Sequence, residues 1–191
     1  MRWTLLTFVI AICLSGCLRA YRKVNTAQPP EYTTTVRADR RWQDSGIRVR
    51  DGQVIQFLAE GQWKDHFNSY GPEGNPEIYK SHFGVRAPAN SLIMQISSQT
   101  NATYFIGKQT NLVAKRSGKL LFRKNYSLPI GMDGEIKVRV KVCSDADSDG
   151  ISDYDEINLW KTDPLSPDSD GDAFSDFEEV SEIQNRIKDK R

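Results

Sequence analysis

One acidic pattern occurs twice near the C-terminus, at an offset of 23 residues. The first copy begins Asp145-Ala-Asp147-Ser-Asp149-Gly150 and ends at Glu156, and the second spans 168–179. Alternate residues of a tight loop point their carboxylates at one centre, as a Ca²⁺ ion with about 6–8 oxygen ligands requires. Without a cation these carboxylates repel one another. The segment is therefore predicted to order itself around metal rather than around an apolar core.

The spacing assigns a role to each position of the two loops. Asp at the first, third and fifth positions points inward, a backbone carbonyl follows, and the final Glu closes the shell with two oxygens. Ala173 stands where the first loop has Gly150, so the second site is expected to be strained or weaker. We expect two or more Ca²⁺ ions. The predicted ligands are Asp145, Asp147, Asp149, the Ile151 carbonyl, Asp153, Glu156, Asp168, Asp170, Asp172, the Phe174 carbonyl, Asp176 and Glu179.

The connector between the copies reads Thr162-Asp163-Pro164-Leu165. Together with the two loops it resembles the bacterial thrombospondin type 3 repeats, over about residues 143–182. The resemblance implies loops wrapped on a row of ions, with Asp163 as an additional ligand. Three alternatives remain: a dockerin-like pair that binds a partner module, an EF-hand pair, and an acidic solubilising tail. An EF-hand would need a helix before its first loop, where this sequence has the strand pattern 136–142.

Short helices are expected after each loop. One covers 154–160. The other covers 177–187, where Phe177, Val180, Ile183 and Ile187 recur at helical spacing on one face. That face is expected to dock on the acidic module or on the preceding domain.

Charge divides the chain into two parts. The formal net charge is only +1, yet residues 17–142 carry +10 and residues 143–182 carry −13, with Lys161 the one basic residue of the second segment. This segregation places a domain boundary near Cys143. A mean hydropathy of −0.56 excludes a polytopic membrane protein. No nucleic-acid partner is expected.

The N-terminus reads as a targeting segment. Met1-Arg2 precede an apolar run, Trp3 to Leu14, that is too short to span a bilayer as a helix. The run ends at Leu14-Ser15-Gly16-Cys17, which resembles the bacterial lipobox. The resemblance implies cleavage after residue 16, lipid on Cys17 and, because Leu18 follows, the outer membrane of a cell envelope. An ordinary secretory signal is the alternative. Residues 17–36, polar and with Pro29-Pro30, are predicted to be a flexible tether.

Residues 37–142 show the pattern of an all-β sandwich. Short apolar runs alternate with turn residues such as Asp51-Gly52. The segment from Ile136 to Val142 alternates strictly, which should point its Ile and Val inward and its Lys and Arg to solvent. The whole chain is thus predicted to be mainly β, a jelly-roll-like sandwich plus a small calcium-loop module with short helices.

The same segment resembles the galactose-binding-like sandwich of the PA-I type bacterial lectins. The matching stretches include Trp42 to Ile47, Gly52 to Trp63, Tyr70 to Gly74 and Gly134 to Val138. In that family, Asn and Asp in the loop before the last strand hold calcium and sugar. Here Arg123 and Lys124 stand in their place, and two cations repel Ca²⁺. The resemblance therefore implies the fold but not that metal site.

A long loop rich in aromatic and amide residues, 66–79, lies within the sandwich region. Long loops on a rigid scaffold often bind ligands. The alternative is that this loop packs its aromatic side chains on its own domain. Candidate ligand-binding residues in and after it are Tyr70, Asn75, Tyr79 and His82.

Three functions follow from these features. The first is a non-enzymatic, lipid-anchored envelope protein whose lectin-like domain recognises a glycan or envelope polymer. The second is a calcium-stiffened spacer that holds a protein partner in an envelope complex. The third, an enzyme, is disfavoured because the acidic residues have a better role as cation ligands, and no Ser/His/Asp order or H-E-x-x-H motif is present.

Overall fold

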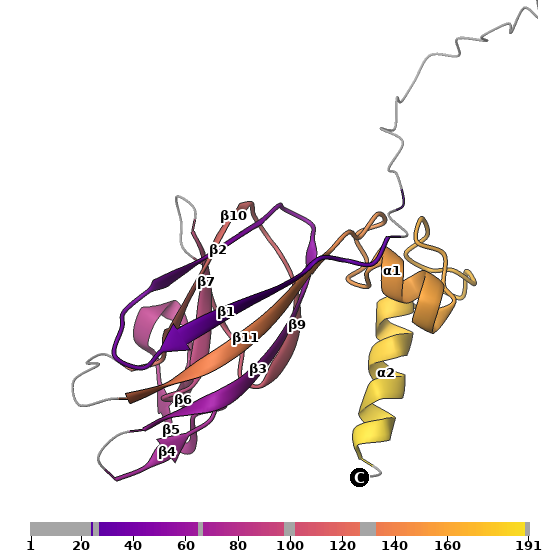
Figure 1. Cartoon of the computed structure of the whole chain (residues 1–191). Helices are drawn as coiled ribbons and strands as arrows, with labels where there is room; N and C mark the ends of the chain where they lie inside the picture. The colour runs from indigo at the N-terminus through magenta and orange to yellow at the C-terminus, as the bar shows by residue number, and fades with distance from the viewer. Residues whose placement is uncertain (1–23, 25–26, 65–66, 98–101, 127–132, 190–191) are drawn as a thin grey trace, which may run out of the picture.

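The computed structural model describes residues 24, 27–64, 67–97, 102–126 and 133–189. It shows an antiparallel β-sandwich followed by a small module of loops and helices, as Figure 1 shows. The predicted fold class, a mainly β sandwich with a small helical module, is confirmed. The segment 1–16 and the proposed lipid-bearing Cys17 lie outside the described residues.

The first sheet is built around the longest strands. Its order is β1 (Glu31–Arg37), β11 (Asp133–Cys143), β3 (Val54–Lys64) and β4 (Ser69–Tyr70), and β9 (Gln109–Val113) also pairs with β3. β11 pairs with β3 over its whole length, from Asp133 opposite Lys64 to Cys143 opposite Val54. The acidic module follows directly after the C-terminal end of β11.

The second sheet has the order β2 (Gln43–Val49), β10 (Gly118–Lys124), β7 (Leu92–Ser97) and β8 (Ala102–Phe105). A separate two-stranded sheet pairs β5 (Asn75–Lys80) with β6 (Ala87–Ala89), and a 3₁₀ turn, η1 (His82–Gly84), lies between them in sequence. All of these pairings are antiparallel.

Alternating strand residues form the core between the two large sheets. In β11, Ile136, Val138 and Val140 are fully buried and Lys137 is exposed, as the sequence predicts. The rings of Phe57 and Phe122, one from each sheet, meet edge to face with centroids 6.0 Å apart. Removal of such large apolar side chains from water is the main source of the sandwich's stability.

The predicted tether 17–36 is too long at its C-terminal end. Residues 31–36 belong to β1, where Tyr32 pairs with Val140 and Thr34 with Val138 of β11. The β-branched Thr33-Thr34-Thr35 run favours an extended strand, and the apolar period is missing because most of β1 is exposed at the sheet edge. The sandwich therefore begins at Glu31 rather than at residue 37.

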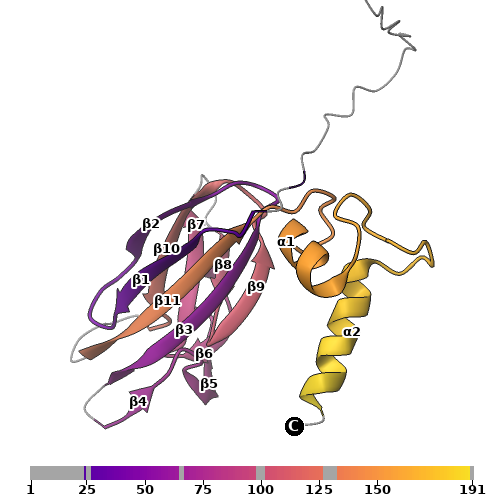
Figure 2. The same ribbon diagram turned by 45° about the vertical axis from the view of Figure 1, so that its right-hand side comes forward.

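The C-terminal module holds three helical segments beside one end of the sandwich (Figure 2). A single turn, α1 (Asp153–Asp155), runs into a π-helical segment, η2 (Glu156–Trp160), and α2 (Asp176–Lys188) follows the second loop. Ser175 and Glu178 form a capping box that starts α2. The expected helix over 177–187 is confirmed, whereas the one over 154–160 is an α turn followed by a π segment.

The described part of the chain contains no helix with the length and apolar character needed to cross a bilayer.

Candidate metal site

The two acidic loops fold in the same way, bond for bond. In the first, the N–H groups of Ser148 and Gly150 donate to Asp145 Oδ1 (2.6 Å) and Oδ2 (3.2 Å). In the second, the N–H groups at the equivalent positions 171 and 173 donate to the two oxygens of Asp168 (2.8 and 3.0 Å). The N–H groups of residues 149, 151, 172 and 174 donate to the carboxylates of Asp147, Asp149, Asp170 and Asp172 in turn. These bonds wrap each loop around a small centre.

The carboxylates of each loop converge on that centre. One oxygen each of Asp145, Asp147 and Asp149 lies within 4.8 Å of the others, and the same holds for Asp168, Asp170 and Asp172. In the first loop, Asp147 Oδ2 and Asp149 Oδ2 are buried and accept no hydrogen bond from any residue that the structure describes. A buried anionic oxygen without a donor is costly. Two of them beside Asp145 form a natural site for a hard cation.

Glu156 completes the first loop. Its side chain is fully buried, and Oε1 accepts a hydrogen bond from the Thr162 hydroxyl (3.3 Å). Oε2 is buried and has no hydrogen-bond partner within the described part of the chain. Burial raises the pKa of Glu156 to about 8, and the charges of Asp147 and Asp149 add to the rise. Burial likewise raises the pKa values of Asp147 and Asp149 to about 6. The first loop therefore holds several partly desolvated carboxylates, and a bound cation would lower the electrostatic cost of keeping them charged.

Two predicted ligands have another task in this structure. Asp153 Oδ1 accepts the N–H of Ala146 (2.7 Å), and Asp176 Oδ1 accepts the N–H of Ser169 (2.9 Å). Both carboxylates are buried, and both tie the start of a helical segment to the second residue of its loop. Neither belongs to the converging Asp triplets. Asp163 is exposed in the connector and its Oδ1 accepts the N–H of Leu165 (3.1 Å), outside both triplets.

The second loop is more exposed than the first. Asp170, Asp172 and Phe174 are exposed, whereas Asp147, Asp149 and Ile151 of the first loop are half-buried or buried. Glu179 is exposed, and its pKa is raised by partial desolvation and then by the surrounding carboxylates of the loop. Ile151 and Phe174 occupy equivalent positions of the two loops, where their N–H groups donate to Asp149 and Asp172.

Left-handed backbone occurs at the same two positions of both loops. They are Ser148 (φ 70°) and Gly150 (φ 109°) in the first, and Gly171 (φ 78°) and Ala173 (φ 81°) in the second. Such angles suit Gly and strain most L-residues. Ala173 does adopt the expected unfavourable angle. However, each loop has one glycine and one strained residue, so the strain does not fall on the second loop alone.

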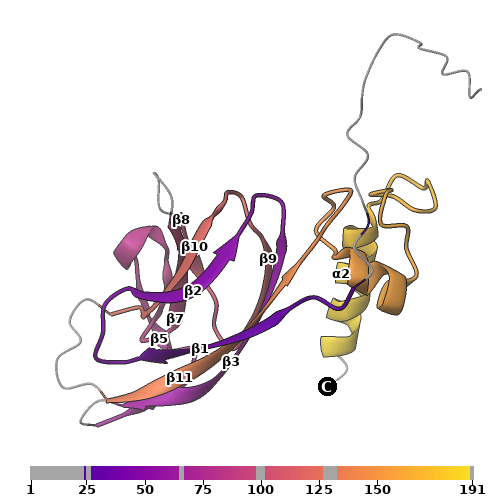
Figure 3. The same ribbon diagram turned by 45° about the horizontal axis from the view of Figure 1, so that its top comes forward.

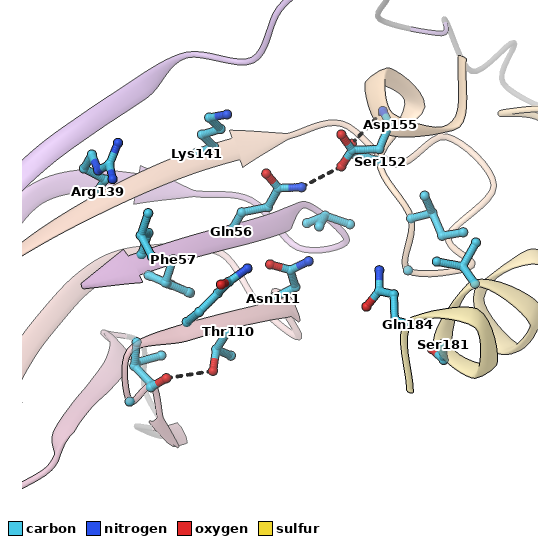
Figure 4. A pocket seen from close by; sticks show the side chains of 18 of the residues that line it. Gln56, Phe57, Thr110, Asn111, Arg139, Lys141, Ser152, Asp155, Ser181 and Gln184 are labelled. Atoms are coloured by element: carbon cyan, nitrogen blue, oxygen red, sulfur yellow. Dashed lines mark hydrogen bonds between the residues drawn. The ribbon is translucent and has the colours of Figure 1, made fainter. Parts of the chain in front are cut away.

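The two loops and the sandwich are joined by specific contacts. The Phe177 ring at the start of α2 lies beside Gly150 of the first loop. Gln56 Nε2 on β3 donates to Asp155 Oδ2 in α1 (2.6 Å), as Figure 4 shows. A cleft of about 1010 Å³ lies beside this bond, between β3 and β9 on one side and Trp160, Phe177 and Val180 on the other. Gln56 gives no sequence signal for this role, because it lies on a strand about a hundred residues upstream.

Sequence reasoning also missed the two serines that begin the helices. The Ser152 hydroxyl accepts the N–H of Asp155 (3.2 Å), and the Ser175 hydroxyl accepts the N–H of Glu178 (3.3 Å). A Ser three residues before an acidic residue is a recognisable helix start. The two serines are also offset by 23 residues, so the repeat extends through both caps.

The candidate ligand residues of the sandwich are spread over different environments. Tyr70 is half-buried and packs against the core, as expected if the loop packs on its own domain. Asn75 accepts the N–H of Glu77 through Oδ1 (2.9 Å). Tyr79 is 52% exposed, with the Arg86 guanidinium 5.3 Å from its ring centroid. His82 begins η1, and its side chain lies outside the described part.

The chain matches no protein-family model and no curated protein. Among solved structures, it is similar to the EclA N-terminal domain, described as a PllA-like lectin, with 18% identity and a TM-score of 0.45. The likeness covers 58% of this chain and 95% of that one. The sandwich described above rests on its own strand pairings and not on this likeness.

Proposed function

We propose that this chain is a calcium-binding protein of the bacterial cell envelope, lipid-anchored through Cys17 and without enzymatic activity. Its acidic module would order around two or more Ca²⁺ ions, and its sandwich would serve adhesion or the recognition of a glycan or envelope polymer. One observation carries the calcium proposal: three buried carboxylate oxygens, on Asp147, Asp149 and Glu156, accept no hydrogen bond from the described residues, and the two aspartates belong to a converging triplet. Oxygen-only ligands favour Ca²⁺ or Mg²⁺ over softer metals.

Trypsin offers a direct test, because Lys161 is the one basic residue in 143–182 and is exposed between the loops. Calcium is expected to protect the Lys161–Thr162 bond, and EDTA to open it. Asp147→Asn should remove the protection, and Asp51→Asn, an exposed acid of the sandwich, should keep it. If isothermal titration detects no Ca²⁺ binding to the wild-type chain, the calcium proposal fails.

Lipid anchoring through Cys17 is tested separately. A palmitate analogue fed to expressing cells should label the wild-type chain and leave Cys17→Ser unlabelled. Equal labelling of both would contradict the anchor. Recovery of the labelled protein with the outer membrane, rather than the inner membrane, tests the proposed location.

A calcium-stiffened spacer that holds a protein partner is the second candidate. The Gln56–Asp155 bond favours it, because it links the ordered module to the sandwich at a fixed place. Saccharide binding would support recognition. No saccharide binding, together with a calcium-dependent complex in cross-linked envelopes, would support the spacer.

A further inference from the structure

A cluster of arginines occupies the end of the sandwich away from the acidic module. β1 starts next to that module, and the β1–β2 connection, which contains Arg40 and Arg41, lies at the opposite end in both Figure 1 and Figure 3. Both arginines are exposed and neither forms an ion pair with another described residue. They line an open groove of about 650 Å³ together with Thr35, Arg37, Trp42, Gln43 and Asp44.

Arg123, on β10 of the second sheet, packs against Trp42 and does not itself line the groove. It is only 5% exposed, and its guanidinium lies 3.6 Å from the ring centroid of Phe83 and 5.3 Å from that of Trp42. Its Nε donates to the Lys124 carbonyl (3.1 Å) and its Nη2 to the Tyr126 carbonyl (2.8 Å). A guanidinium has five donor hydrogens, so two bonds to neutral carbonyls leave most of them unused.

The described residues place no carboxylate against Arg123. Asp44 is held by Lys119 Nζ (2.7 Å) and Asp39 by Arg37 Nε (3.1 Å), so the nearby acids are already neutralised. Burial, and then the charge of Arg41, lowers the pKa of Arg123 to about 10. A buried cation without an anion is unfavourable and calls for a compensating ligand or role.

The structure around Arg123 is held in a strained form. Phe83 has left-handed backbone (φ 60°, ψ 22°), which is rare for an aromatic residue, and its carbonyl accepts a hydrogen bond from Thr103 Oγ1 (2.6 Å). The rings of Trp42 and Phe83 meet edge to face at 5.9 Å. Strain of this kind is characteristic of binding sites, where the surrounding structure holds a residue in place.

We propose that Arg40 and Arg41 bind the anionic group of an acidic saccharide, and that the buried Arg123 positions the Trp42 ring and adds positive charge next to the groove. The paired donors of arginine match a carboxylate, sulfate or phosphate. The groove is larger than an isolated anion, and the Trp42 ring and Thr35 hydroxyl supply stacking and hydrogen-bonding groups for a sugar. This inference rests on the proposed recognition role of the sandwich, to which it gives a place and a ligand class. It is independent of the calcium loops at the other end.

The test compares a galacturonate trimer with its methyl ester, which keeps the rings and loses the charge. Both are titrated into the full-length chain carrying Cys17→Ser, with calcium in excess. The acid is expected to bind and the ester to bind at least about tenfold more weakly, with an affinity for the acid that falls as salt rises. Sulfated and phosphorylated monosaccharides then identify which anion is preferred.

Variants separate binding from folding. The exposed pair Arg40→Gln/Arg41→Gln should weaken binding of the acid by about tenfold or more, and Arg123→Gln, which removes the charge packed against Trp42, by a smaller factor. Arg50→Gln, an exposed arginine at the far end of β2, removes the same charge and should leave binding unchanged. If Arg123→Gln fails to fold, the exposed pair decides the question alone.

Three outcomes would overturn the inference. Equal binding of acid and ester, unaffected by the arginine variants, would leave glycan recognition standing and remove the anion site. No saccharide binding by a chain that still binds calcium would remove both the anion site and the recognition role. Arginine-dependent binding to phosphatidylglycerol vesicles, without saccharide binding, would identify a lipid surface instead.

Discussion

The first and second acidic loops share a backbone, a hydrogen-bond pattern and three converging aspartates, yet they differ in their surroundings. The first ends at the buried Glu156 and lies beside Phe177 of α2, while the second ends at the exposed Glu179 and faces solvent. Charges interact more strongly where water is excluded. We therefore expect the residues packed around each loop, and not the repeated motif itself, to set the affinity of that loop for calcium.

Burial acts on the first loop in two opposite ways. It raises the electrostatic cost of the metal-free state, as the raised pKa values of Glu156, Asp147 and Asp149 indicate. It also holds the ligand oxygens in place before the cation arrives, which lowers the ordering cost of binding. Both effects favour tight binding, so we expect the first loop to fill before the second.

The largest expected effect comes from the closing glutamates. Glu156→Gln should weaken binding at the first loop on the order of 100-fold, because it removes a buried bidentate carboxylate. The amide can keep the hydrogen bond to Thr162 and removes the buried charge, so the metal-free fold should not be weakened. Glu179→Gln should weaken the second loop by about tenfold, because exposed carboxylates are hydrated and screened. Calcium titration of each single variant measures both effects.

Equal losses of calcium affinity in the two glutamine variants would contradict the claim that burial makes the first loop bind more tightly. Loss of the tighter of two binding steps in Glu179→Gln would contradict it as well. Thermal unfolding in EDTA provides the folding control, since neither substitution is expected to lower the unfolding temperature of the metal-free chain.

A smaller effect should follow from relieving the left-handed residues. Ala173→Gly in the second loop and Ser148→Gly in the first each remove backbone strain of about 1 kcal/mol. Each glycine also raises the conformational entropy of the unfolded chain, which costs up to about the same free energy. We therefore expect each to change calcium affinity by less than about fivefold and by similar factors. Calcium titration of the two variants checks this. A large gain confined to Ala173→Gly would mean that backbone strain, and not burial, makes the second loop weaker.

The sequence predicts the repeat well because its information is local. Ligand spacing, the turn positions and the helix over 177–187 depend on neighbours within about a dozen residues. The alternation of Ile136 to Val142 is local too, and β11 follows it. The expectation that residues 31–36 form a tether was wrong because β1 is defined by its partner β11, a hundred residues away, and not by an apolar period of its own.

The difference between the two loops could not be read from the sequence. Glu156 and Glu179 occupy equivalent positions, and only the tertiary packing of the folded chain makes one buried and the other exposed. Similarly, the sequence predicts Asp153 and Asp176 as ligands from their spacing, while the structure shows their oxygens accepting loop N–H groups. The burial of Arg123 between Trp42 and Phe83 brings together three segments far apart in the chain.

Gln56 tests whether the sandwich contributes to the burial of the first loop. Gln56→Leu removes the hydrogen bond to Asp155, at a cost of about 1–2 kcal/mol because the acceptor is charged.

The buried thiol of Cys143 at the end of β11 reports the change, since burial raises its pKa to about 11 and keeps it unreactive. With Cys13 and Cys17 replaced by Ser, Cys143 is the only thiol of the chain. Gln56→Leu should speed its reaction with a thiol reagent by about fivefold or more, whereas the exposed Gln109→Leu on β9 should not. An unchanged rate would mean that the first loop owes its burial to the module alone.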